Sequence, residues 1–379
     1  MNRNNLQQIF RHYIDKFEYI NNDINEEYYK WQVCHQYPIL MKKALSADDE
    51  HFADALKEVK KCTFNIIDSY TQPFAGFVEF ARTEPDVVRG IFNDLYADDG
   101  GDIKIRKEKI EDFFKHSDDQ LSRLMPDSHL YKQNSHSVSA YLFLNDPNNH
   151  YMYKAVQSQR FADCIEFYDD WGVGDNIRLD IYHRMCDELV AFINECPELL
   201  ETDKSRFDGG LKLHGGELHP DEKKHILAFD LIYCCSVYDL FDGISYTKRN
   251  MKEKQLYLAE KKKAQSLKED FDKSKAEYDL LEEATEFLAG MIKVGDKIIH
   301  KKYGEGVVNE INIKTITAIY DAGQISISLP VGVGNGILTV PGVDAIIEKY
   351  GAVLRRYDKI PNRMEMASRA LEPYEEYLE

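Results

Sequence analysis

The stretch Lys293–Ile311, KVGDKIIHKKYGEGVVNEI, decides the fold of the C-terminal part of the chain. Two short apolar runs, 297–300 and 306–311, flank the segment KKYGEG. The glycines of this segment can adopt the positive φ or the bulge that a tight reversal of the chain needs. The stretch therefore predicts a β-hairpin.

Further strands follow this hairpin. In KTITAIYD (314–321) and QISISLP (324–330) apolar and polar residues alternate with a period of two, which is typical of half-buried strands. GNGILTVPG (334–342) adds a turn and one more strand. Short antiparallel strands that are joined by tight turns must close or cover their edges. We therefore expect residues 291–357 to form a small all-β, SH3-like barrel of five strands that is closed and folds alone.

The stretch resembles the opening of the Tudor-like domain that ends UvrD/PcrA-type helicases and is related to the RNA-polymerase-binding domain of CarD-type regulators. The residues that carry the resemblance are Val294, Gly295, Asp296, His300, Tyr303, Gly304 and Gly306. The resemblance extends over 293–357, with a looser fit in its second half. It implies a binding module for a protein partner, such as RNA polymerase or a restriction or repair complex, and it implies no chemistry.

The composition is that of a globular, cytoplasmic chain. It has 379 residues, 43% of them hydrophobic and 30% charged, which suits two or three domains. No run approaches the roughly 18 apolar residues of a membrane span. The N-terminal segment 1–17 is amphipathic and lacks the apolar core of a signal peptide. Seven scattered cysteines without a CxxC pair indicate a reducing compartment.

The charge is distributed unevenly along the chain. The net charge is −18, but residues 291–357 hold eight Lys or Arg and six Asp or Glu, so that this segment has a net charge of +2 and the remainder −20. A negative chain is a poor general binder of nucleic acid. Lys297, Lys301 and Lys302 crowd the first hairpin, and Tyr303 adds an aromatic side chain at its turn. We predict that these four residues bind the partner, with an inward-packed Tyr303 as the alternative for that ring.

A long charged helix is predicted before the barrel, because residues 247–290 contain no proline and no glycine until the last position. Apolar and small residues recur there at spacings of four and three. They are Leu267, Phe271, Ser274, Tyr278, Leu281, Thr285 and Leu288. Such a seam must be buried against another helix. Its partner is either a helix of the same chain or a second copy, in which case residues 257–288 would form a homodimer.

The N-terminal two thirds are predicted to be mixed α+β and mostly α. Helical periodicity appears in five segments, which are 1–17, 51–67, 105–117, 181–195 and 221–235. The exception is HSVSAYLFLNDPNNHYMYK (136–154), in which two β-prone runs around NDPNN predict two strands and a turn. The predicted organisation is a helical segment (1–50), a mixed recognition domain (51–245), a helical linker (246–290), the barrel (291–357) and a helical tail (358–379).

A second resemblance covers parts of the recognition domain. Residues 94–121, 136–163 and 219–235 are similar to the region that precedes the motor in McrB-type AAA+ GTPases of modified-DNA restriction. The shared positions are Ile110 with Phe113 or Phe114, Tyr141 to Tyr153 with Lys154, and Asp230 with Ile232 and Tyr233. The GxxxxGK[ST] phosphate loop of that motor is absent from the sequence. The resemblance implies an accessory role in restriction-like phage defence or nucleic-acid metabolism, without binding or hydrolysis of GTP or ATP.

One loop offers an enzymatic alternative. HGGELHP places Glu217 between His214 and His219, and side chains of these types can hold a catalytic metal. Their spacing differs from the HExxH pattern, which puts both histidines on one face of a helix. We therefore expect a non-enzymatic interaction protein without metal or cofactor. A metal-dependent hydrolase that uses this loop is the alternative function.

Overall fold

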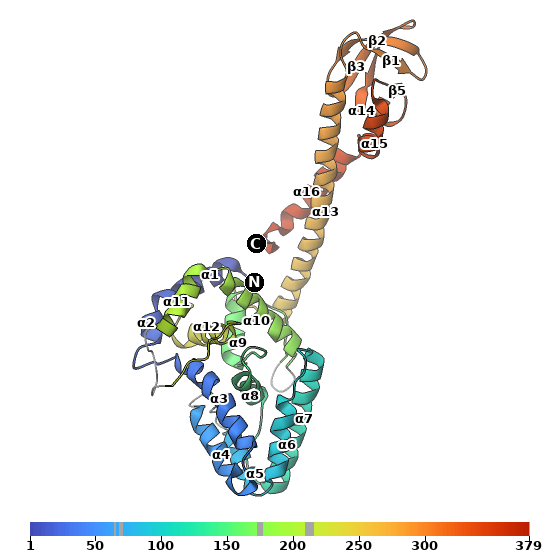
Figure 1. The fold of residues 1–379 in the computed structure, drawn as a ribbon. Coiled ribbons are helices and arrows are strands. Elements are labelled where there is room, and N and C mark those ends of the chain that lie inside the picture. Colours follow the sequence, from blue (N-terminus) through green and yellow to red (C-terminus); the bar gives the residue numbers. More distant parts are fainter. Residues whose placement is uncertain (64–65, 68–70, 173–176, 209–215, 379) are drawn as a thin grey trace. The chain divides into compact units, whose positions relative to one another are not determined.

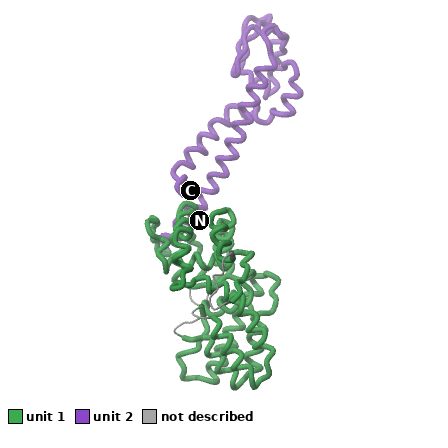
Figure 2. Tube along the Cα trace, turned by 60° about the vertical axis from the view of Figure 1, so that its left-hand side comes forward, with its two compact units in different colours: residues 1–251 green, residues 252–379 purple. Residues whose placement is uncertain are grey.

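The structure is a computed structural model that describes residues 1–378 except 64–65, 68–70, 173–176 and 209–215. The chain forms two compact units, residues 1–251 (unit 1) and 252–379 (unit 2) (Figure 2). The finer division into five segments that the sequence suggests stays a prediction. None of the helices in the described ranges is long and apolar enough to cross a lipid bilayer.

The regular elements of unit 1 are helices throughout its described part (Figure 1). They are α1 (Arg3–Asp15), α2 (Phe17–Ile20), α3 (Tyr29–Leu45), α4 (Asp49–Cys62), α5 (Pro73–Ala81), α6 (Pro85–Tyr96), α7 (Ile103–Leu124), α8 (Ser135–Asn145), α9 (Ala155–Cys164), α10 (Leu179–Asn194), α11 (Pro197–Asp208) and α12 (His225–Val237). All five segments with helical periodicity lie mainly in helices, in α1, α4, α7, α10 and α12. Side-chain caps begin several of them, since Asn2, Asp48 and Asp102 each accept a backbone N–H of the first turn.

The predicted strand pair at 136–154 is wrong. Residues 135–145 form helix α8, which starts with a capping box: Asn134 Oδ1 accepts the Ser137 N–H at 2.9 Å, and Ser137 Oγ accepts the Asn134 N–H at 3.0 Å. Residues 137–144 are buried without interruption. A helix that is buried on all sides has an apolar run without helical periodicity, and such a run looks like a strand. Unit 1 is therefore mostly helical, around α8 and an equally buried α12.

Unit 2 contains all but the first residue of the long helix α13 (Met251–Met291), and it continues as a small β half-barrel. Its elements are β1 (Lys297–His300), β2 (Gly304–Ile311), β3 (Thr315–Tyr320), β4 (Gly323–Ser328), α14 (Leu329–Gly334), β5 (Leu338–Thr339), α15 (Val343–Leu354), α16 (Ile360–Leu371) and the 3₁₀-helix η2 (Glu372–Tyr377). The strands pair antiparallel in the order β4-β3-β2-β1-β5. The five-stranded antiparallel sheet after a mostly helical region confirms the predicted fold class.

The half-barrel differs from the closed barrel that the strand pattern suggests. β4 and β5 stand at opposite ends of the strand order and do not pair. Helix α14 lies between them on the inner side, because a Cβ at Gly332 would lie 3.2 Å from the Ile327 side chain and 3.3 Å from that of Leu338. The helices α14 and α15 were not predicted. They supply Leu329, Val333 and other core residues that a closing strand would otherwise provide.

The apolar seam of α13 is covered within the chain over its C-terminal half. Leu281 and Leu288 share one core with Ile346 and Leu354 of α15 and with Ile360 of α16. Polar contacts fasten the same helices, because Glu277 accepts from Arg356 at 2.7 Å and from Arg363 at 3.3 Å. Helix α16 runs beside α13 in Figure 1. The intramolecular alternative therefore accounts for this part of the seam, and a homodimer through 257–288 stays a prediction.

Candidate functional site

The first hairpin, β1 and β2 with their turn, is held by a histidine. His300 is buried, and its Nδ1 accepts the backbone N–H groups of Lys302 at 3.0 Å and of Tyr303 at 3.2 Å. Gly304 then continues the turn at a φ of 73°, which a residue with a Cβ rarely adopts. The turn is thereby fixed from within, and the side chains of Lys301 and Lys302 are left exposed.

The start of the hairpin is fixed in a similar way. Asp296 Oδ2 accepts the Lys293 N–H at 2.7 Å, and the Asp296 C=O accepts the Val308 N–H at 2.9 Å. Gly295 has a φ of 95° and donates its N–H to the Val308 C=O at 2.8 Å. The Gly-Asp pair of the motif therefore joins the end of α13 to the sheet. The presence of these two residues in the motif is thus explained by the fold and requires no ligand.

A close approach explains the second glycine of the turn segment. Gly306 of β2 pairs with Tyr320 of β3, and a Cβ at position 306 would lie 2.5 Å from the Tyr320 ring. The aromatic ring thus covers the glycine and fills the space that a side chain would take. Burial raises the pKa of Tyr320, and its buried hydroxyl has no hydrogen-bond partner among the residues that the structure describes.

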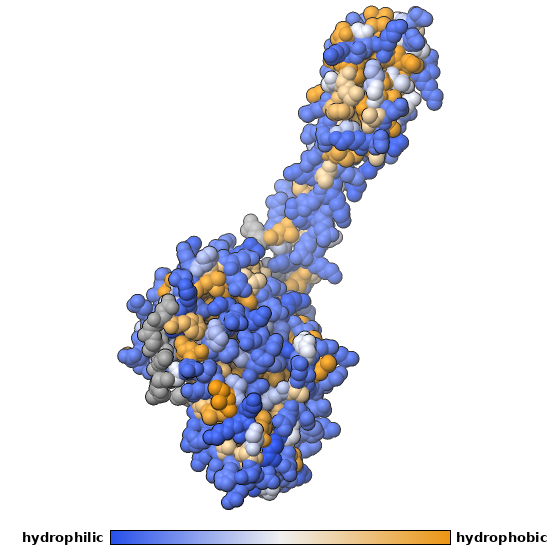
Figure 3. Space-filling model, viewed as in Figure 1, coloured by the Kyte–Doolittle hydropathy of each residue, from blue (hydrophilic) through white to orange (hydrophobic). Residues whose placement is uncertain are grey.

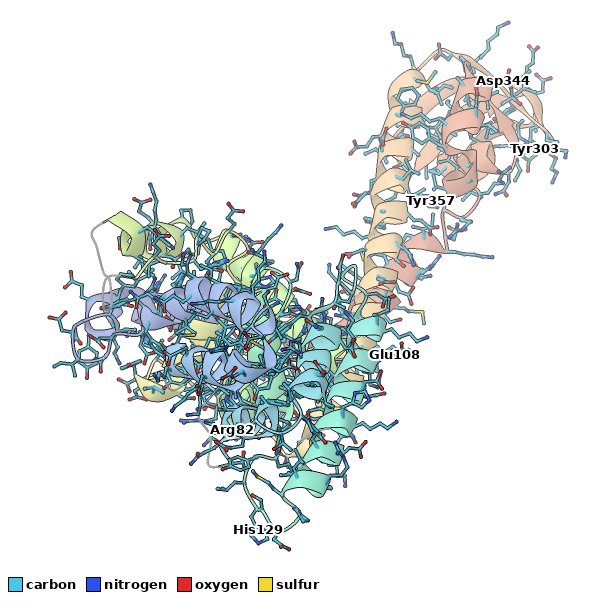
Figure 4. All side chains as sticks on the ribbon, turned by 60° about the horizontal axis from the view of Figure 1, so that its bottom comes forward. Arg82, Glu108, His129, Tyr303, Asp344 and Tyr357 are labelled. Atoms are coloured by element: carbon cyan, nitrogen blue, oxygen red, sulfur yellow. The ribbon has the colours of Figure 1, made fainter. Side chains whose placement is uncertain are left out.

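The Tyr303 ring lies against the open end of the half-barrel. It stacks on His300 with a centroid distance of 4.6 Å, and its centroid is 5.9 Å from that of Tyr320. It remains half-buried, and Figure 4 places it at the margin of the half-barrel. The ammonium group of Lys302 lies 5.2 Å from its centroid, a distance at which a cation and a ring attract each other. Tyr303 thus packs onto the core, and its role in partner binding stays a prediction.

The outer face of the sheet carries a patch that sequence reasoning missed. Ile299 of β1, Val307 of β2 and Ile319 of β3 are 50%, 45% and 53% exposed. Val307 pairs directly with Ile319 on one side and with Lys297 on the other. Ile299 pairs with Glu305, so it lies diagonally from Val307 on the same face. We call Ile299, Val307 and Ile319 the aliphatic patch. Figure 3 shows apolar residues at the surface of this end of unit 2.

The sequence contained a signal for the patch. KIIH and GVVNE each hold two adjacent aliphatic residues, and adjacent residues of a strand point to opposite faces. One member of each pair therefore had to face away from the core. Ile298 and Val308 are the buried members, while Ile299 and Val307 are exposed. The structure brings the exposed members close to Lys297, one of the predicted binding residues.

The loop of the enzymatic alternative is tied to α3. Glu217 Oε2 pairs with His35 Nε2 at 3.2 Å, and His219 Nδ1 accepts the Asp221 N–H at 3.0 Å. The His219 N–H also donates to the Trp31 C=O at 3.0 Å. His214 lies outside the described residues. Within the described ranges, no group of three His, Cys, Asp or Glu side chains is arranged to hold a metal ion.

Unit 1 contains a buried ionic network that sequence reasoning also missed. We use this name for Tyr13, Glu27, Lys30, Arg206 and Asp230. The Lys30 ammonium contacts Asp230 and lies 2.8 Å from Glu27 Oε2. The Tyr13 hydroxyl donates to Asp230 Oδ2 at 2.5 Å and accepts from the Arg206 guanidinium at 2.8 Å. Burial alone would lower the pKa of Lys30, but the neighbouring carboxylates of Asp230 and Glu27 raise it well above its usual value. The network joins α1, α3, α11 and α12.

A group of histidines lies elsewhere in unit 1. The Tyr151 ring stacks on His225 at 4.0 Å and meets His183 edge-on at 5.2 Å. His150, His183 and Arg106 line a cavity of about 20 Å³ beside them, which is room for one water molecule. Burial, together with the charge of Arg106, lowers the pKa of both His150 and His183 to about 3. These imidazoles are therefore neutral near pH 7.

Comparison of the chain with protein-family models, with curated proteins and with solved structures gave no match.

Proposed function

We propose that unit 2 is a docking module which binds an acidic, partly apolar protein surface through the first hairpin and the aliphatic patch. The observation that carries the proposal is the aliphatic patch, in which three branched side chains are about half exposed to solvent near Lys297. Exposed apolar residues that adjoin one another mark interaction sites. The lysines around them would attract and orient a negatively charged partner.

The structural roles of the other residues of the motif support the assignment of the lysines to partner binding. Gly295, Asp296, His300, Gly304 and Gly306 hold the backbone of the hairpin, as their hydrogen bonds, φ angles and close contacts indicate. The lysines at 297, 301 and 302 remain exposed after this structural accounting. These lysines can therefore meet a partner, as can the exposed Glu305 and Glu310 of the same hairpin.

The wider role rests on the two resemblances. The Tudor-like opening and the McrB-like segments favour a non-enzymatic accessory protein in restriction-like phage defence or nucleic-acid metabolism. RNA polymerase and a restriction or repair complex are the partners that suit such a protein. Direct binding of nucleic acid is the second candidate, and the net charge of −18 argues against it. The hydrolase alternative is weaker, because Glu217 and His219 already have protein partners.

The experiment compares the full chain with a variant that carries Lys297→Glu, Lys301→Glu and Lys302→Glu. Each protein is immobilised, and association with purified RNA polymerase and with proteins captured from a host lysate is followed at low and at high salt. We expect the variant to associate at least about tenfold more slowly, and with less dependence on salt. Tyr303→Ala should in addition raise the dissociation rate.

The matched control replaces three exposed lysines of unit 2 that lie outside the first hairpin, Lys273→Glu, Lys275→Glu and Lys314→Glu. Its net charge changes by the same amount, so it should bind nearly as the unaltered protein does. An equal loss of partner binding in both variants would show that only the overall charge matters. Undiminished capture of the partner by the first variant would refute the proposal. Fluorescence anisotropy with duplex and single-stranded DNA tests the second candidate.

A further inference from the structure

Strand β4 forms an open edge of the sheet in unit 2. It pairs with β3 on one side, and no strand of the described residues pairs with its other side. Every second residue therefore directs its N–H and C=O groups away from the sheet. Its sequence, Gly323 to Ser328, contains no charged residue and no proline, and the irregularity in the sheet lies between β2 and β3. Charges, prolines and bulges, which protect many edges from pairing, are therefore missing from β4. The opposite edge, β5, is only two residues long.

We propose that the β4 edge pairs with the β4 edge of a second copy of this chain, antiparallel across a twofold axis at Ser326. The sequence around this residue is Gln-Ile-Ser-Ile-Ser, which reads nearly the same in both directions. An antiparallel pair centred on Ser326 sets Ile325 opposite Ile327 of the second copy, and Gln324 opposite Ser328. An interface around a twofold axis must be self-complementary, and this strand meets that condition.

The two faces of such a pair are chemically consistent. Ile325 and Ile327 are half-buried and pack at the margin of the unit 2 core, so that their pairing would continue this core into the second copy. On the other face, Ser326 Oγ lies 2.6 Å from Thr317 Oγ1 of β3, and the two Ser326 side chains would extend this row of hydroxyl groups. No like charges meet, because the β4 strand is neutral.

The proposed pairing is independent of the docking function and of the seam on α13. It uses the backbone edge of β4, whereas the aliphatic patch lies on the outer face of β1, β2 and β3 and would stay exposed in both copies. A dimer would then present two docking surfaces. A partner with two binding sites would be held more tightly than one site allows.

Charge exchange at the axis tests the pairing. Ser326→Lys and Ser326→Glu each place two like charges beside the twofold axis, and the Ser326 side chain is exposed, so that the fold should tolerate both. We expect the full chain to be a dimer in sedimentation equilibrium. Each variant alone should raise the dissociation constant at least about tenfold. An equimolar mixture of the two variants should form a heterodimer, because opposite charges then meet.

Ser266→Lys is the matched control, since it adds the same charge at an exposed serine on α13. It should leave the dimer unchanged. A protein that is monomeric at every concentration overturns the proposal. So do dimers that survive in both Ser326 variants, because their interface would lie elsewhere, such as the seam of α13. Failure of the mixture to form a heterodimer, after both variants have become monomers, also counts against a twofold axis at Ser326.

Discussion

The ionic network described in unit 1 is buried, whereas the ion pairs described in unit 2 are exposed. In unit 1, Lys30, Asp230 and Arg206 are buried at the meeting point of four helices. In unit 2, the ion pairs that join α13 to α15 and to α16, which are Glu283 with Lys349 and Glu277 with Arg363, lie at the surface. A buried charge that loses its partner destabilises a protein strongly, whereas a surface pair contributes little. The stability of unit 1 should therefore depend on each member of the buried network keeping its partner, whereas the surface ion pairs of unit 2 should contribute little.

The largest expected effect comes from breaking the buried ionic network. Asp230→Ala removes the acceptor of Tyr13 and one of the two carboxylates that pair with Lys30, so that the buried ammonium group keeps Glu27 as its counter-ion. We expect a loss of about 3–5 kcal/mol in the free energy of unfolding. Hydrogen-exchange mass spectrometry on the full chain should show the loss of protection in peptides of unit 1, with unit 2 unchanged.

Two controls sharpen this result. The triple replacement of Glu27→Gln, Lys30→Met and Asp230→Leu removes the three charges that meet at the Lys30 ammonium group, so it should cost less than the single change. Glu58→Ala breaks an exposed pair with Lys61 in the same unit and should have no measurable effect. An Asp230→Ala protein as stable as the unaltered chain would show that the network does not support unit 1.

The next effect is a loss of stability of unit 1 in acid. The pKa values of His150 and His183 are about 3 in the folded chain and about 6.5 in an unfolded chain. As the pH falls below 6.5, the unfolded state therefore binds protons that the folded state excludes. At about pH 4.5 each histidine should lower the free energy of unfolding by about 2–3 kcal/mol relative to neutral pH.

Urea unfolding at a series of pH values measures how the free energy of unfolding changes with pH. His183→Phe keeps a ring beside Tyr151 and removes one titrating group, so it should flatten the pH dependence. Asp221 acts in the opposite direction, because burial raises its pKa to about 6 and its protonation favours the folded state as the pH falls. An unchanged slope in His183→Phe would mean that this histidine is not responsible.

The smallest effect is expected in unit 2. Gly306→Ala would force a Cβ against the Tyr320 ring, which must shift within a packed core. We expect unit 2 to lose about 1–3 kcal/mol, seen as faster hydrogen exchange in β2 and β3 while unit 1 is unaffected. Gly290→Ala is the control: its Cβ would meet no atom within 4 Å, and a helical alanine should stabilise by about 0.5–1 kcal/mol. A stable Gly306→Ala variant would contradict the close packing.

Local sequence patterns predict those elements whose structure depends on residues that are close together in the sequence. The hairpin of β1 and β2 follows from its glycines and alternating residues, and its predicted position agrees with the structure. Helix α8 was mistaken for a strand pair because it is buried on all sides. Lys30 and Asp230 are 200 residues apart, and no local pattern predicts such a contact. The uneven charge of the sequence indicates the lysines of the candidate site. The aliphatic patch can be recognised only when the register of three strands is known.

The contact of Gly306 with the Tyr320 ring also constrains how this sequence can diverge. A residue larger than glycine at position 306 requires a smaller side chain at position 320, so the two positions should change together among homologous chains. Tyr320 lies on the next strand and outside the glycine-rich turn segment 301–306. A search pattern that couples the second glycine of the turn to an aromatic residue on the following strand would therefore separate descendants of this half-barrel from chains that share only a glycine-rich turn.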